Sequence, residues 1–271
     1  MSRAAAFCDL DRTLVYSPSA LSLPMPDAEA PRLVCVEVYD GRPLSFMTEP
    51  AAAGIATLNE AGALVPVTTR TPEQYHRIHL PGPTPKFAVT ANGGRLLRDG
   101  LEDLDYSAAL SSRLESSGAS FEEIWAHLGA QASSEVGQGF IEKHRNAESL
   151  FCYAVVRRSE MPASWLVALT GFCEQRGWKV SVQGRKVYCV PDGLSKGVAL
   201  REVAAILGVS ATLAAGDSIL DRELLQAADL AIRPAHGELH ETSWTAPHLT
   251  VTAAAGVLAG EEIVSWLGAR L

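Results

Sequence analysis

Short apolar segments alternate with segments of helical periodicity at both ends of this chain, and this alternation restricts the fold more than any other feature. In the first ninety residues it predicts strands at 4–10, 63–68 and 87–90, and helices at 49–60 and from Thr71-Pro72 onward. After residue 190 it predicts helices at 196–207, 219–227 and 256–267, and strands at 211–215 and 229–233. Such alternation is typical of an α/β fold, a doubly wound parallel sheet covered by helices on both faces.

The middle of the chain interrupts this pattern. It contains a polar helical stretch at 106–130, an alternating strand at 149–157, a helix at 164–176 and two strands at 179–183 and 186–190. We therefore expect a core formed by residues 1–93 and 190–271, with an inserted α+β domain at 94–189. A smaller insertion, a β-hairpin at about 33–48, is indicated by two alternating runs around Asp40-Gly41.

Composition limits the cellular setting and the partners. With a net charge of −8, the chain is a poor candidate for binding nucleic acid or an anionic membrane. Its five cysteines are scattered and lack CxxC spacing, which favours reduced thiols in a cytoplasmic protein. The N-terminus lacks the apolar core of a signal peptide, and no stretch is long and apolar enough to span a bilayer. We expect a monomer or homodimer acting on a small molecule.

Polar residues follow the predicted core strands at the points where these strands end. Strand 4–10 leads into Asp9-Leu10-Asp11-Arg12-Thr13, and strand 63–68 into Thr68-Thr69-Arg70. Lys196 opens a helix, and strand 211–215 is followed by Gly216-Asp217-Ser218, with Asp221 shortly after. In a parallel sheet the carboxyl ends of the strands meet at one edge, so these groups are expected in one crevice.

This set of groups suits phosphoryl chemistry. Several carboxylates around one point repel one another unless a cation joins them, and hard oxygen ligands favour Mg²⁺. A lysine and a threonine in the same crevice suit the oxygens of a phosphoryl group. One carboxylate can then attack phosphorus, while a second protonates the leaving oxygen and later activates water.

The four motifs, DxDxT, a threonine ending the next strand, a downstream lysine and GDxxxD, resemble those of the haloacid dehalogenase-like (HAD) phosphatases. The resemblance spans residues 9 to 221. It implies a nucleophile that also binds Mg²⁺ at Asp9, and a general acid and base at Asp11 whose carbonyl binds the metal. It further implies phosphoryl binding by Thr68, charge neutralisation by Lys196, and metal binding by Asp217 and Asp221.

The insertion resembles the C2-type cap of the sugar-phosphatase branch, because TANGG at 90–94 is followed by about ninety residues and then GLSKGVAL. Within it, FIEKHRNAESLFCYAVVRR resembles cap strands of trehalose-phosphate and related sugar-phosphate phosphatases. The chain departs from the family at Arg12, where glycine is usual, and at Thr69, where glycine or serine is frequent. The resemblance implies further candidates for substrate binding, namely Arg12, Thr69, Arg70, Asn92, Glu142, Lys143, Arg145 and Ser218.

Other interpretations remain open. Taken alone, DxDxT and Asp217-Ser218 are also helix N-cap patterns, and Lys196, Glu142, Lys143 and Arg145 are compatible with a solvated surface. Arg70 is equally compatible with a surface salt bridge. The favoured function is a Mg²⁺-dependent phosphomonoester hydrolase that forms an aspartyl phosphate on a sugar or polyol phosphate. A phosphomutase and a non-catalytic phosphate-sensing or protein-binding module are the alternatives.

Overall fold

The computed structural model describes residues 4–114 and 118–271, which form two compact units. The first unit contains Met1–Asp103 and Ser195–Leu271, and the second contains Leu104–Leu194. Both borders lie later in the chain than the sequence patterns indicate. The first border moves because β6 (Arg95–Arg98) pairs with β5 (Phe87–Thr90) of the first unit, and β7 (Leu101–Glu102) pairs with β6.

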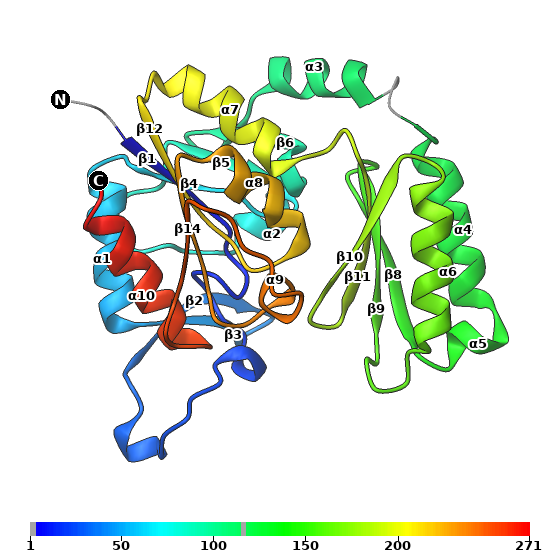
Figure 1. Ribbon diagram of the computed structural model, residues 1–271, viewed down its shortest axis with the longest axis horizontal. Coiled ribbons are helices and arrows are strands. Elements are labelled where there is room, and N and C mark those ends of the chain that lie inside the picture. Colours follow the sequence, from blue (N-terminus) through cyan, green and yellow to red (C-terminus); the bar gives the residue numbers. More distant parts are fainter. Residues whose placement is uncertain (1–3, 115–117) are drawn as a thin grey trace. The chain divides into compact units, whose positions relative to one another are not determined.

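A five-stranded parallel sheet forms the centre of the first unit (Figure 1). Its strand order is β14 (Leu249–Val251), β13 (Leu230–Arg233), β12 (Ala211–Ala215), β1 (Ala4–Cys8) and β4 (Leu64–Pro66). Cys8, the last residue of β1, pairs with Ala215 on one side and Pro66 on the other. The carboxyl ends of these three strands therefore lie level at one edge of the sheet.

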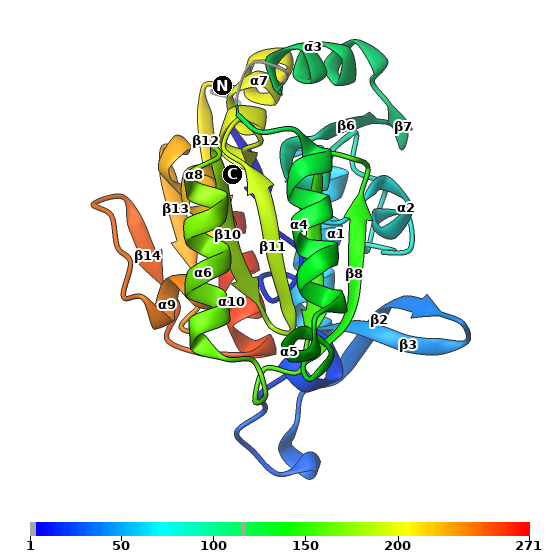
Figure 2. The same ribbon diagram turned by 90° about the vertical axis from the view of Figure 1, so that its right-hand side faces the viewer.

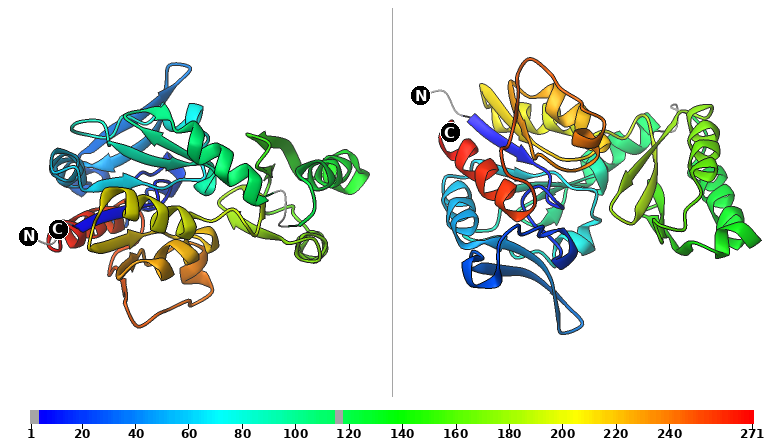
Figure 3. Two further views of the ribbon diagram at one scale, coloured as in Figure 1. Left: turned by 90° about the horizontal axis from the view of Figure 1, so that it is seen from above. Right: turned by 60° about the horizontal axis from the view of Figure 1, so that its bottom comes forward.

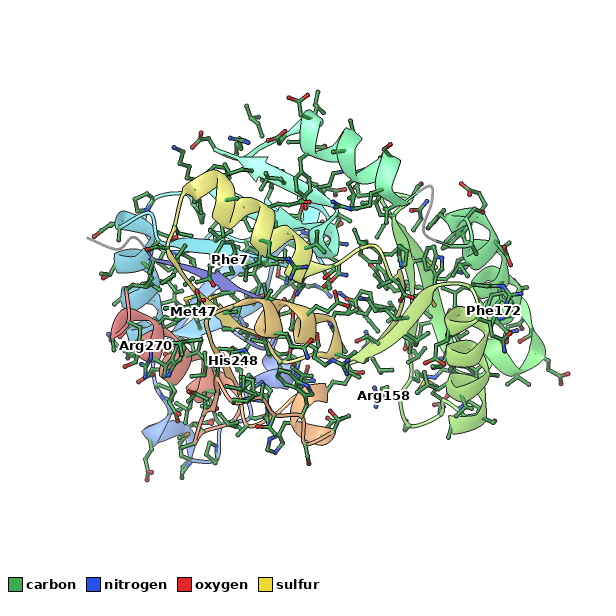
Figure 4. All side chains as sticks on the ribbon, turned by 45° about the horizontal axis from the view of Figure 1, so that its top comes forward. Phe7, Met47, Arg158, Phe172, His248 and Arg270 are labelled. Carbon is green, nitrogen blue, oxygen red and sulfur yellow. The ribbon has the colours of Figure 1, made fainter. Side chains whose placement is uncertain are left out.

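Helices cover both faces of this sheet. Because successive strand residues point to opposite faces, Ala6 and Cys8 pack in one core cluster with Ile55 of α1 (Glu49–Glu60) and Ile263 of α10 (Val257–Gly268). Helices α7 (Lys196–Leu207) and α8 (Arg222–Ala227) lie on the other face (Figure 3). The fold is thus a doubly wound α/β sheet. Phe7 and Met47, labelled in Figure 4, are both fully buried in this unit.

Two small antiparallel sheets complete the first unit. Strands β2 (Leu33–Tyr39) and β3 (Arg42–Thr48) form a hairpin, whose turn residues Asp40 and Gly41 both have positive φ, as a two-residue turn favours. Strands β5, β6 and β7 form the other sheet, which meets the parallel sheet at one bridge between Val67 and Val89. The short elements are η1 (Pro18–Ala20), η2 (Asp27–Glu29), α2 (Pro72–Tyr75), η3 (Ala91–Gly93), η4 (Ile219–Asp221) and α9 (Glu238–Glu241).

The second unit is an α+β sandwich. Its antiparallel sheet has the order β10 (Trp178–Gln183), β11 (Lys186–Pro191), β9 (Phe151–Val156) and β8 (Ile141–Ala147). Helices α4 (Phe121–Ser133) and α6 (Ala163–Glu174) pack against one face of it (Figure 2). The helical stretch expected at 106–130 consists of α3 (Leu104–Leu114) and α4, and α5 (Glu135–Gln138) follows. Throughout the described residues, every helix is too short or too polar to cross a membrane.

Candidate functional site

Three aspartates meet at the carboxyl edge of the parallel sheet. Asp9 directly follows β1, Asp217 lies two residues after β12, and Asp221 ends η4. All three are buried, and one carboxylate oxygen of each lies within 4.8 Å of the others. The Thr13 hydroxyl donates to Oδ2 of Asp9 at 3.2 Å, which orients that carboxylate. Adjacent strands β1 and β12 therefore bring together the acidic residues of the first and last motifs.

Lys196 lies within this acidic cluster, at the first position of α7. Its Nζ donates to Oδ1 of Asp9 and to Oδ1 of Asp221, both at 2.6 Å, and its side chain has no exposed surface. Burial opposes the charged ammonium, but Asp221 and Asp9 outweigh it and raise the pKa of Lys196 above its usual value. The lysine is therefore a fixed positive charge between two carboxylates.

One ammonium does not balance three buried carboxylates. Burial, with repulsion from Asp221 next in size, raises the pKa of Asp9 to about 7 despite the opposing effect of Lys196. The same two causes raise the pKa of Asp217 well above its usual value. A divalent cation would relieve this repulsion, and three carboxylates are the hard ligands that Mg²⁺ binds. The acidic cluster therefore fits the metal that the sequence motifs imply.

Backbone geometry fixes Asp221 in the cluster. Its Oδ2 accepts from the backbone N of Asp217 at 3.1 Å, the backbone N of Ser218 at 2.9 Å and the Ser218 hydroxyl at 2.7 Å. A Cβ at Gly216 would lie 2.4 Å from Cβ of Asp221, so the chain needs glycine here. Ser218, expected as a substrate contact, is instead seen holding this carboxylate.

Arg12 contacts the cluster from a left-handed backbone position. Its φ of 66° explains why glycine suits this place, since a Cβ is strained there. Its Nε lies 3.5 Å from Oδ2 of Asp217, and its carbonyl is 2.8 Å from Nε2 of His236. Because Nδ1 of His236 accepts from the Gly256 N–H, Nε2 carries the proton and donates to Arg12. Burial lowers the pKa of His236 to about 4, which favours this neutral form.

Asp11 binds the guanidinium of Arg70. Arg70 Nε donates to Oδ2 of Asp11 and its Nη2 donates to Oδ1, each at 2.8 Å. The same guanidinium donates to both oxygens of Glu37, at 2.9 and 3.0 Å. The Arg70 side chain is only 11 % exposed, so these contacts are not a surface salt bridge. Glu37 was missed by the motif analysis, although it is the one charged residue in the apolar run LVCVEVY.

Thr68 lies next to a tight turn that also approaches Lys196. The Thr68 hydroxyl accepts from the Arg70 N–H at 3.1 Å, so its own hydrogen can be donated to a ligand. Its carbonyl accepts from the N–H of Asn92, a buried residue of η3. In the same turn, Gly93 has a φ of 99°, and a Cβ there would lie 2.6 Å from the Ser195 carbonyl. Thr69, next to Thr68, is also buried.

The remaining candidates lie in the second unit, on β8. Glu142, Lys143 and Arg145 are exposed, and Glu142 pairs with Arg185 at 3.4 Å. Arg145 pairs in register with Tyr153, and Tyr153 with Tyr188, so these three residues share one face of the sheet. Two cations of β8 therefore stand on a face that also carries aromatic side chains.

Comparisons with known proteins show which solved structures have a similar fold. No protein-family model matches the sequence, and no curated protein matches it. The solved structures include a sucrose-phosphatase from Synechocystis sp. PCC6803 in complex with sucrose and phosphate, with 16 % identity, a TM-score of 0.67 and 98 % coverage of both chains. A trehalose-6-phosphate phosphatase related protein has 18 % identity and a TM-score of 0.56, over 98 % of this chain and 97 % of that one. A phosphatase of the HAD superfamily from Bacteroides thetaiotaomicron has 15 % identity and a TM-score of 0.52, over 99 % and 96 %.

These similarities extend over both units. The chain therefore has the fold of the HAD phosphatases with a C2-type cap, as the motifs indicate.

Proposed function

We propose that this protein is a Mg²⁺-dependent phosphomonoester hydrolase that acts on a small sugar or polyol phosphate through a phosphorylated Asp9. The observation that carries the proposal is the buried cluster in which Lys196 contacts both Asp9 and Asp221 at 2.6 Å. Buried carboxylates that only stabilise a fold are usually balanced by partners, whereas here the pKa of Asp9 is raised to about 7, by burial first and by Asp221 second. Such an imbalance is typical of a functional site.

Asp9, Asp217 and Asp221 would hold the metal, together with the carbonyl of Asp11. When bound, Mg²⁺ supplies positive charge to the phosphoryl oxygens and to the acidic cluster. Lys196 adds a second fixed positive charge. The Thr68 hydroxyl, whose position is set by the Arg70 N–H, donates to a phosphoryl oxygen.

Asp9 is suited to be the nucleophile because both of its oxygens are oriented. Lys196 holds Oδ1 and Thr13 holds Oδ2, so the carboxylate cannot rotate freely. An oxygen of Asp9 attacks phosphorus while the bond to the ester oxygen breaks, giving an aspartyl phosphate and an alcohol. Water then attacks the same phosphorus, which releases inorganic phosphate and restores Asp9.

Asp11 is suited to proton transfer in both steps. Arg70 occupies one edge of its carboxylate, while 38 % of the Asp11 side chain is exposed. A carboxylate has about four lone-pair sites, and the two hydrogen bonds from Arg70 use two of them. In its protonated form Asp11 gives a proton to the departing alcohol, and the resulting carboxylate then takes a proton from the attacking water, which restores the acid.

The second unit supports the choice of a sugar or polyol phosphate. Lys143 and Arg145 are two exposed cations on one face of its sheet, and they suit an anionic group of the substrate. With Glu142, they are the proposed contacts to substrate, as Arg12, Thr69 and Asn92 are in the first unit. The scattered cysteines and the net charge of −8 support a cytoplasmic enzyme that binds neither nucleic acid nor membranes.

The test is phosphate release from a panel of sugar, polyol and aryl phosphates, with Mg²⁺ and with EDTA. We expect the wild type to release phosphate with Mg²⁺ but not with EDTA. We expect Asp9→Asn to release no phosphate. Asp105→Asn, at an exposed position of α3, is the matched control and retains activity.

Each outcome has a distinct meaning. Release that survives Asp9→Asn would contradict the nucleophile. Formation of an isomeric sugar phosphate without free phosphate would indicate a phosphomutase. A folded wild type that is inert toward every ester would favour a binding module.

A further inference from the structure

The guanidinium of Arg70 joins two carboxylates that are far apart in the chain. One edge binds Asp11, the proposed general acid, through two hydrogen bonds of 2.8 Å. The other binds Glu37 through hydrogen bonds of 2.9 and 3.0 Å. Bidentate pairs of this kind fix the plane of both partners. The orientation of Asp11 therefore depends on a chain of contacts that begins at Glu37.

Further contacts hold the Glu37 carboxylate in place. The Ser45 hydroxyl of β3 donates to its Oε2 at 2.6 Å, and Nε of Arg77 lies 3.6 Å from its Oε1. Its side chain is 3 % exposed. A buried carboxylate is costly unless it is paired and hydrogen-bonded, and Glu37 meets both conditions.

The hairpin is anchored so that this strand residue faces Arg70. The pairing of β2 with β3 shifts register on both sides of Glu37, and such a bulge re-aims a side chain. Behind it, the N–H of His79 donates to the Val36 carbonyl at 2.7 Å, and Glu37 forms a bridge with Ile78. Hairpin, Arg70 and Asp11 all belong to the first unit. Their arrangement is thus fixed within one compact body.

We propose that Glu37 is a positioning residue for the general acid, acting through Arg70, and that the β2–β3 hairpin is thereby part of the catalytic apparatus. This inference rests on the proposed phosphatase function. Without Glu37, two nitrogens of a guanidinium that is 11 % exposed would lose their carboxylate. Arg70 would then adopt other rotamers, and Asp11 would lose its fixed edge.

The leaving group of the substrate provides the test. An alkyl or sugar alcohol leaves poorly and needs the proton of Asp11, whereas p-nitrophenolate leaves without help. In Glu37→Gln we expect kcat/KM on a sugar phosphate, which reports formation of the aspartyl phosphate, to fall by about tenfold to a hundredfold, part of the effect of a general acid. On p-nitrophenyl phosphate we expect kcat/KM to fall by less than about threefold, because the first step then needs no proton from Asp11.

Three further variants make the result specific. Glu49→Gln removes a carboxylate that pairs with Arg32 on the surface, and it should leave both rates unchanged. Ser45→Ala removes only the 2.6 Å hydrogen bond to Glu37, and it should give a smaller change in the same direction. In a protein that already carries Arg70→Met, Glu37→Gln should cause no further loss of activity, because the connection between Glu37 and Asp11 is already broken.

The outcomes separate this inference from the function on which it rests. Equal losses of kcat/KM on both substrates would overturn the role of Glu37 while leaving the phosphatase intact. Inactivity of the wild type on every ester would overturn the proposed function, and the role of Glu37 with it. If Glu37→Gln does not fold, as judged by circular dichroism, the Ser45→Ala ratio decides.

Discussion

The Nε of Arg12 lies 3.5 Å from Oδ2 of Asp217, so a basic side chain at an unspecified position of the DxDxT motif contacts one of the three clustered aspartates. Arg12 reaches it from a backbone with φ of 66°, where an L-residue is strained by about 1 to 2 kcal/mol. The contact and the strain occur at the position where the motif resemblance leads us to expect glycine. Arg12 is therefore a feature of this chain that its motifs do not explain.

Replacing Arg12 by glycine should strengthen the binding of Mg²⁺. The Arg12 side chain is 34 % exposed, so its pairing with Asp217 is worth about 0.5 to 1 kcal/mol. Loss of this competing pair should lower the Kd for Mg²⁺ by about twofold to fivefold. Isothermal titration calorimetry measures the Kd for Mg²⁺ in each variant. Arg12→Lys keeps the charge and the strained backbone and should behave like the wild type. Equal affinity in all three proteins would contradict the competition.

Binding of Mg²⁺ should release protons near neutral pH. Burial and the neighbouring Asp221 raise the pKa of Asp9 to about 7, and metal ligands must be deprotonated. Calorimetry at pH 6.5 in two buffers of different ionisation enthalpy should therefore give different heats, and the difference should vanish by about pH 9. Identical heats at pH 6.5 would show that the acidic cluster is already ionised.

The raised pKa of Asp9 also determines how the stability of the metal-free protein changes with pH. Between about pH 4 and 7 the folded state binds more protons at Asp9 than the unfolded state does. The contribution of Asp9 to the free energy of unfolding therefore falls as pH rises through this window. Mg²⁺ should accordingly raise the melting temperature more at pH 8 than at pH 5, which thermal melts at both values measure.

Gly216→Ala should destabilise the protein. A Cβ at residue 216 would lie 2.4 Å from Cβ of Asp221, so the Asp221 carboxylate and its turn must shift, at a cost of about 2 kcal/mol or more. Gly171→Ala is the matched control, because a Cβ in that helix meets nothing within 4 Å and alanine favours helices. Urea unfolding compares them, and equal stability of Gly216→Ala and the wild type would contradict the close packing.

His236 should make stability depend on pH in the acid range. Burial lowers its pKa to about 4 from an ordinary value of 6.5, so the unfolded state binds more protons between these values. Its contribution is fully present above about pH 6.5 and is lost as pH falls through about 4. In His236→Gln the slope of unfolding free energy against pH should decrease across this window, as denaturant titrations at several pH values show. An unchanged slope would show that His236 does not cause this pH dependence of stability.

Local sequence patterns predicted the regular elements of the first unit well. The helices expected at 49–60 and 196–207 have these bounds in the structure, because each has a capping residue and helical periodicity. Strand β14 was missed, since Leu249–Val251 is too short to show a period. The strand at 87–90 joins the parallel sheet through one parallel bridge, between Val67 and Val89, and its longer pairing is antiparallel with β6, which local propensity does not determine.

The candidate site was predictable only where its residues follow a motif. Asp9, Lys196, Asp217 and Asp221 meet because parallel strands end at one edge, a rule that needs only strand order. Glu37 reaches Arg70 across 33 positions of sequence and through a bulge, and neither is encoded in a local pattern. The contact between Arg12 and Asp217 likewise depends on a backbone conformation that the residue type disfavours.

The second unit ends at Leu194, and the next residue, Ser195, already caps α7, whose first residue is Lys196. At the other border, β6 and β7 separate the Thr68–Asn92 region from Leu104. Exchange of the inserted unit between related proteins is therefore tolerated unequally at its two borders. A recombination point near Asp103 leaves the reacting groups in place, whereas one beyond Leu194 displaces the lysine itself. Diversification of the insert by recombination is accordingly freer at its beginning than at its end.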